Sequence, residues 1–222
     1  MDIKVKKALE AAVNNYASVE QIDGQAILPG LAEAFELEKP FMEKVEAMDA
    51  VFDENQRFEE LREYTFDLLM INFFAEDVQK LEEDYLDSEE WESIEEETLD
   101  RGSELLNILL YLRECADDDV EPSLDDFLKE FLLVEEDEFQ DEYRIYEKVI
   151  ANQILVDSEY SEIAKVSATI SKEDELVDLF YPLVSFFNEQ NPNQAQLESY
   201  AEAGSNKALD IALLQLIINY NS

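Results

Sequence analysis

Carboxylates are the only abundant side chains in this chain of 222 residues that could do chemistry. The chain holds 56 Asp and Glu residues, one cysteine (Cys115) and no histidine. The missing histidine excludes Ser-His-Asp and Cys-His nucleophile pairs and imidazole metal ligands. Zinc sites need clusters of Cys or His, and no glycine-rich phosphate loop occurs among the 4 glycines. Any catalysis would therefore use carboxylates with a hard cation such as Mg²⁺.

Two spaced pairs of carboxylates are the candidates for such a metal site. Glu92 and Glu95 form the first pair, and Glu114 and Asp117 follow eighteen residues later. Residues three apart share a helix face. The pattern resembles the carboxylate motif of all-α nucleotide pyrophosphatases, which implies Mg²⁺ held between two helices. The spacing here predicts instead that both pairs lie on one long helix. A Mg²⁺-dependent enzyme is therefore kept only as an alternative hypothesis. The leading hypothesis, given below, expects no cofactor.

A second short motif overlaps the first. Asp117, Asp118 and Glu121 form a DDxx(D/E) pattern that is similar to the metal-binding motif of the isoprenoid synthases, which are all-α enzymes. In that family the motif belongs to a helix that faces a cavity. Pro122 follows directly in this chain, so we expect a solvated, helix-ending loop instead.

The strongest quantitative feature is the stretch 82–100, with eleven acidic residues in nineteen and neither Lys nor Arg. As a helix it would carry one charge per about 2.6 Å, comparable with one per about 1.7 Å in duplex DNA. A second acidic run at 135–142 could extend this surface. Six carboxylates lie away from the apolar stripe of the predicted helix and are expected to be exposed and to contact a partner: Glu89, Glu90, Glu96, Glu97, Asp100 and Glu104.

The net charge of −40 indicates the class of partner. Residues 51–150 carry −27 of it, which disfavours direct binding to nucleic acid or to an anionic membrane, because both need cationic contacts. The leading hypothesis is a non-enzymatic binding protein for a basic protein, such as a nuclease or a DNA-binding protein. Its more specific form is a DNA mimic or immunity-type inhibitor, since the composition is similar to that of acidic antirestriction and immunity proteins. Other hypotheses are a surface kept acidic only for solubility or in an acidic cytoplasm, and an apolar-groove scaffold or homodimer.

Apolar periodicity predicts an all-α fold. Residues 64–75 are apolar on nearly every side, so 58–81 is expected to be a central helix that others surround. Segments 105–112 and 208–220 are similarly apolar and are its expected neighbours. We predict a single domain, 1–222, with about nine to eleven helices in a bundle and a possible subdivision near 117–123; a two-lobed arrangement or an irregular α-solenoid is the alternative. The other helices are expected at 3–17, 31–38, 40–53, 88–117, 124–134, 139–156, 158–170 and 172–189.

Several single residues carry local expectations. Ser88 and Ser123 are predicted N-caps, and Pro182 is expected to kink its helix. Gly102 indicates either a close helix approach or a break. Asp67 shares a stripe with Glu60 and Glu63, so we expect it to face water.

The remaining features concern location. One cysteine permits no internal disulfide, which favours a reducing compartment. The N-terminal residues lack the apolar core of a signal peptide, and no apolar run reaches the roughly 20 residues that a membrane span needs. We expect a cytoplasmic protein without membrane contact, and the oligomeric state stays open.

Overall fold

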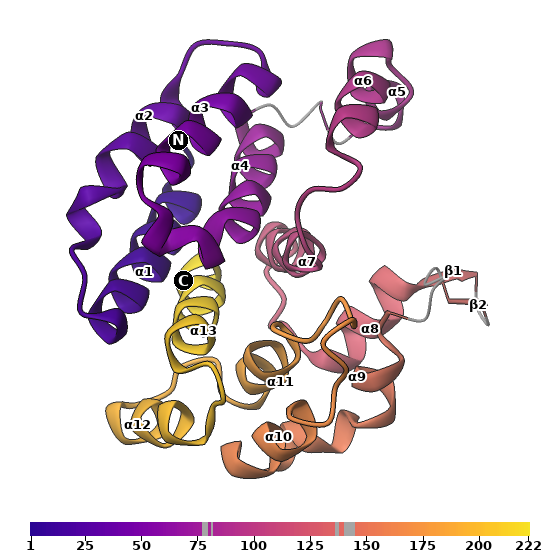
Figure 1. Ribbon diagram of the computed structural model, residues 1–222. Helices are drawn as coiled ribbons and strands as arrows, with labels where there is room; N and C mark the ends of the chain where they lie inside the picture. The colour runs from indigo at the N-terminus through magenta and orange to yellow at the C-terminus, as the bar shows by residue number, and fades with distance from the viewer. Residues whose placement is uncertain (77–79, 81, 136–137, 140–144) are drawn as a thin grey trace.

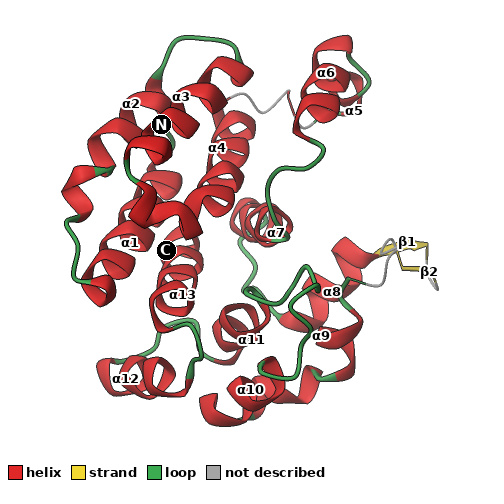
Figure 2. Ribbon diagram, viewed as in Figure 1, coloured by secondary structure: helices red, strands yellow, loops and turns green. Residues whose placement is uncertain are grey.

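The computed structural model is a multi-helix bundle, which confirms the all-α prediction (Figures 1 and 2). It describes residues 1–76, 80, 82–135, 138–139 and 145–222. This part of the chain holds thirteen α-helices, slightly more than the nine to eleven expected. Their bounds are α1 (Ile3–Glu20), α2 (Leu28–Glu36), α3 (Phe41–Glu54), α4 (Arg62–Glu76), α5 (Glu83–Leu86), α6 (Glu89–Thr98), α7 (Leu105–Asp117), α8 (Leu124–Leu132), α9 (Glu147–Ala151), α10 (Tyr160–Ser167), α11 (Phe180–Asn188), α12 (Gln194–Ala203) and α13 (Lys207–Asn221).

Helix α4 is buried along almost its whole length, as its apolar sequence predicted. Every residue from Tyr64 to Phe74 is buried, and α1, α3 and α7 pack against this helix. The helix is shorter than the expected 58–81, because the 3₁₀ segment η2 (Gln56–Leu61) precedes it. Of its expected end, residues 77–79 and 81 lie outside the described residues.

Helix α13 links the two ends of the chain. It packs along α1 and also contacts α11, α7 and α12 (Figure 1). These helices, rather than α4, are the main partners of α13. Of the two segments expected beside the central helix, 105–112 (α7) packs closely on α4 and 208–220 (α13) does not. The buried apolar side chains from Val5 to Tyr220 form one hydrophobic cluster. A subdivision near 117–123 stays a prediction.

The expected long helix over 88–117 is two helices. Helix α6 ends at Thr98 and α7 begins at Leu105. Gly102 between them has a φ of 83°, a left-handed conformation that favours glycine and cannot continue a helix. The sequence analysis expected Gly102 to mark either a break or a close approach, and both are present. The approach is close because a Cβ added at Gly102 would lie 2.6 Å from Oδ1 of Asp67.

Several other expected helices are shorter or replaced. Strands β1 (Leu133–Glu135) and β2 (Glu138–Phe139) form a small antiparallel hairpin where helices had been expected at 124–134 and 139–156. Helix α9 and the 3₁₀ segment η4 (Gln153–Asp157) follow in the later part of the second one, while its residues 140–144 lie outside the described residues. Helix α11 begins at Phe180 instead of residue 172, so Pro182 lies in its first turn, where proline is tolerated, and causes no kink.

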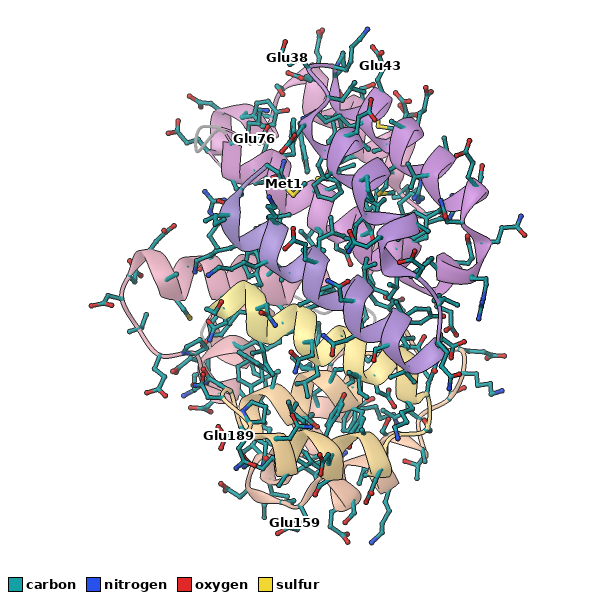
Figure 3. The ribbon with its side chains drawn as sticks, turned by 90° about the vertical axis from the view of Figure 1, so that its left-hand side faces the viewer. Met1, Glu38, Glu43, Glu76, Glu159 and Glu189 are labelled. Atoms are coloured by element: carbon teal, nitrogen blue, oxygen red, sulfur yellow. The ribbon has the colours of Figure 1, made fainter. Side chains whose placement is uncertain are left out.

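Two further observations concern the ends of helices and the membrane. Ser88 and Ser123 accept hydrogen bonds from the backbone N–H groups of Trp91 and Asp126, as N-caps do, so both cap predictions are confirmed. The N-terminal amine lies 3.7 Å from Glu76, near the end of α4 (Figure 3). Among the described residues, no helix combines the length and apolarity that crossing a bilayer requires.

Candidate acidic interface

Helix α6 is held to the body of the protein by one narrow apolar face. Ile94 and Thr98 are buried, and the half-buried ring of Trp91 packs at 5.4 Å from Phe74 and 6.2 Å from Tyr85, measured between ring centroids. The helix therefore lies beside α4 and turns most of its circumference to solvent (Figure 1).

The exposed side of α6 is a dense row of carboxylates. Six glutamates in ten helical residues correspond to one charge per about 2.5 Å of axis. Within the described part of the chain, none of them pairs with a Lys or Arg side chain at ion-pair distance. All six are exposed: Glu89, Glu90, Glu92, Glu95, Glu96 and Glu97. Four of these, Glu89, Glu90, Glu96 and Glu97, are among the predicted partner-binding residues.

Two predicted interface residues lie beyond the helix. Asp100 is exposed, as expected. Glu104 is only partly exposed and accepts hydrogen bonds from the Tyr146 hydroxyl at 2.7 Å and from Asn107 at 2.9 Å. Because α6 ends at Thr98, the seven-residue spacing that placed Glu104 in the same row as Glu90 and Glu97 does not apply. The second acidic run, 135–142, lies mostly outside the described residues.

Arg101 fastens the segment after α6 to the N-terminal helices. Its guanidinium forms a bidentate pair with Asp49 of α3, with both N–O distances at 3.0 Å. Its Nε donates to Glu63 of α4 at 3.1 Å, and the group lies 4.9 Å from the centre of the Phe66 ring. Arg101 therefore has its charge and its donors engaged within the protein.

Asp67 of α4 binds the same segment, residues 99–103, through Ser103. Its carboxylate accepts hydrogen bonds from the backbone N–H and the hydroxyl of Ser103, while Glu63 accepts from the N–H of Gly102 at 2.7 Å. Asp67 is 1% exposed, so the expectation that it faces water is wrong. Burial raises the pKa of this carboxyl to about 8, against the opposing effect of the Ser103 hydrogen bonds.

A pocket of about 600 Å³ lies between α4 and α6, above this docking point. Phe66, Met70 and Leu106 supply apolar walls, and Trp91 and Leu99 add further apolar surface. Glu92, Glu95 and Glu96 of α6 line it as well. The pocket thus combines apolar walls with carboxylates from the acidic row.

The candidate metal ligands do not form a site. Glu92 and Glu95 lie on α6 and Glu114 and Asp117 on α7, so the expectation that one helix carries both pairs is wrong. All four are exposed, and among the described residues no three carboxylate or cysteine side chains are grouped as metal binding requires. Asp118 caps α7 and Glu121 lies in the exposed loop that follows, as expected for the second motif.

Sequence reasoning missed the docking of residues 99–103 on α4. Two signals were present: Arg101 interrupts the apolar spacing of the expected helix, and Gly102 is one of only 4 glycines. Neither signal identifies Asp49, Glu63 or Asp67 as the partners.

Comparison with models of known protein families gives no match, and neither does comparison with curated proteins or with solved structures.

Proposed function

We propose that this chain is a non-enzymatic binding protein that uses the exposed glutamates of α6 to contact a basic protein. The observation that carries the proposal is the row of six exposed glutamates without a Lys or Arg partner in the described part of the chain. Carboxylates that the fold does not use are available to cations from outside. Helix α6 itself lies at the periphery of the fold, next to α5 (Figure 1).

The spacing of these charges supports a more specific form of the proposal. One charge per about 2.5 Å approaches the density of duplex DNA, so the natural partners are proteins that bind phosphate backbones, such as nucleases or DNA-binding proteins. Occupation of such a site would exclude DNA from it. The protein would then act as a DNA mimic.

The competing explanation is acidity for solubility alone. Carboxylates also cover other surfaces, including Glu38 and Glu43 at one end and Glu159 and Glu189 at the other (Figure 3). A test must therefore compare the removal of two exposed charges from α6 with the removal of two exposed charges from another helix. Helix α12 offers the match, because Glu198 and Glu202 are both exposed.

Two double variants remove the same charge from these two helices. Glu90→Gln with Glu97→Gln alters α6, and Glu198→Gln with Glu202→Gln alters α12. The pairs are matched, since Glu97 accepts a hydrogen bond from Ser93 at 3.1 Å and Glu198 accepts one from Gln194 at 3.0 Å. Each immobilised protein would capture proteins from a lysate of the source cells, with washes at about 0.1 M and about 0.5 M salt.

We expect wild type and the α12 variant to retain a basic protein at the lower salt and to release it at the higher one. The α6 variant should hold it roughly two- to thirtyfold more weakly, because two exposed ion pairs contribute about 0.4–2 kcal/mol. Added duplex DNA should displace the partner if the protein mimics DNA. Equal capture by all three proteins would assign the acidity to solubility.

A further inference from the structure

The pocket between α4 and α6 combines apolar walls from three helices with acidic side chains of α6. Phe66 and Met70 come from α4, Trp91 from α6, and Leu106 from α7. Leu99, which lines the same pocket, is 83% exposed, the largest fraction among the exposed large apolar residues of the described chain. Its volume of about 600 Å³ falls within the range of pockets that hold ligands.

The charged groups that line the pocket favour a cation. Glu92, Glu95 and Glu96 are exposed and unpaired among the described residues. Arg101 also lines the pocket, but Asp49 and Glu63 already bind its guanidinium. Asp67 is held by Ser103. An anion would meet three free carboxylates and no free cation of the described lining.

We propose that this pocket receives one apolar side chain from a basic segment of the partner protein, while Lys or Arg residues beside it contact Glu92, Glu95 and Glu96. The inference rests on the proposed function and specifies its partner. It requires a polypeptide with an apolar anchor between cationic residues, since apolar walls and acidic residues lie in one pocket. A second copy of this chain is a poor occupant, because each copy carries a net charge of −40.

Trp91 provides a direct probe of the pocket, because it is the only tryptophan in the chain and lines the pocket. Two synthetic peptides of equal length and equal lysine content would be titrated into the full-length protein. One carries serine between the lysines, and the other replaces a single central serine by leucine. Neither contains tryptophan, so the emission reports on Trp91 alone.

We expect both peptides to bind at about 0.1 M salt and the leucine peptide to bind roughly tenfold more tightly, since burying one leucine side chain supplies that difference. Only the leucine peptide should shift the Trp91 emission to shorter wavelength. Leu99→Ser should remove most of its advantage. Ile154→Ser should not, because Ile154 is 78% exposed and does not line the pocket.

The failures of the two proposals are distinguishable. If the two peptides bind equally and Glu90→Gln with Glu97→Gln still weakens both, the pocket proposal fails and the acidic interface stands. If binding is altered neither by the α6 double variant (Glu90→Gln with Glu97→Gln) nor by salt, the acidic-interface proposal fails. A leucine advantage without any change in Trp91 emission, or an emission shift caused by raising the protein concentration alone, would also overturn the pocket proposal.

Discussion

Ser103 donates two hydrogen bonds to the carboxyl group of Asp67, one from its backbone N–H at 3.0 Å and one from its hydroxyl at 2.5 Å. The two residues are 36 positions apart and join the segment after α6 to the middle of α4. Because α6 itself buries only a narrow face, this contact and the Arg101 pairs fix where the acidic row is presented. The position of the proposed interface therefore depends on a buried carboxyl group.

That carboxyl group should make stability depend on pH. The pKa of Asp67 is raised to about 8, mainly by burial, whereas an unfolded aspartate has a pKa near 3.9. Between about pH 4 and 8 the folded state holds a proton that the unfolded state has lost, so the free energy of unfolding falls as the pH rises through this window. Above about pH 8 Asp67 is ionised in both states, and the stability that its protonation contributed at lower pH is lost.

The variant Asp67→Asn isolates this contribution, because the amide keeps the shape and can still bond with Ser103. Urea unfolding of both proteins at several pH values between 5 and 8 cancels the pH dependence of all other titratable groups, which the two proteins share. We expect wild type to lose stability relative to the variant by about 1 kcal/mol for each pH unit. A difference that does not change with pH would contradict the raised pKa.

Gly102→Ala should destabilise the same contact. The residue has a φ of 83°, and the new Cβ would lie 2.6 Å from Oδ1 of Asp67. We expect a loss of about 1–3 kcal/mol in the free energy of unfolding, together with a shift of Trp91 emission to longer wavelength as α6 loosens. Gly24→Ala is the control, since its φ is ordinary and its closest contact is the Asn14 side chain at 3.2 Å. An equal loss at both glycines would argue against the special role of Gly102.

Local sequence signals were sufficient for the fold class and for much of the interface. Apolar periodicity predicted the all-α bundle and the burial of 64–74, and the caps at Ser88 and Ser123 depend on hydrogen bonds within three residues. The exposure of Glu89, Glu90, Glu96, Glu97 and Asp100 followed from their distance from the apolar stripe.

Contacts between distant parts of the chain could not be predicted in this way. Asp67 shares a helical stripe with Glu60, which is exposed, yet residues 99–103 cover Asp67 itself. The helix break at Gly102 moved Glu104 out of the acidic row and separated Glu92 from Glu114. Periodicity describes one element at a time and carries no information about which segment covers it.

Arg101→Lys should loosen α6 while keeping the charge. Lysine cannot reproduce the bidentate pair with Asp49 together with the bond to Glu63, and a hydrogen bond to a charged group contributes about 1.5–3 kcal/mol. We expect a loss of roughly 2 kcal/mol and faster amide hydrogen exchange in α6. Arg57→Lys is the control, because Arg57 donates to the backbone carbonyl of Glu20 at the end of α1 and not to Asp49 or Glu63. Exchange in α6 that responds equally to both variants would contradict the role given to Arg101.

Two buried tyrosines that pack on Tyr200 should respond differently to loss of the hydroxyl. The hydroxyl of Tyr160 has no hydrogen-bond partner among the described residues, whereas that of Tyr181 donates to the carbonyl of Tyr200 at 2.8 Å. Phenylalanine keeps both ring contacts, which lie at 5.5 Å and 4.4 Å between centroids. Urea unfolding should show Tyr181→Phe losing about 1–2 kcal/mol and Tyr160→Phe unchanged or up to about 1 kcal/mol more stable. A similar loss at Tyr160 would mean that its hydroxyl is hydrogen-bonded in solution, because only a satisfied buried hydroxyl contributes to stability.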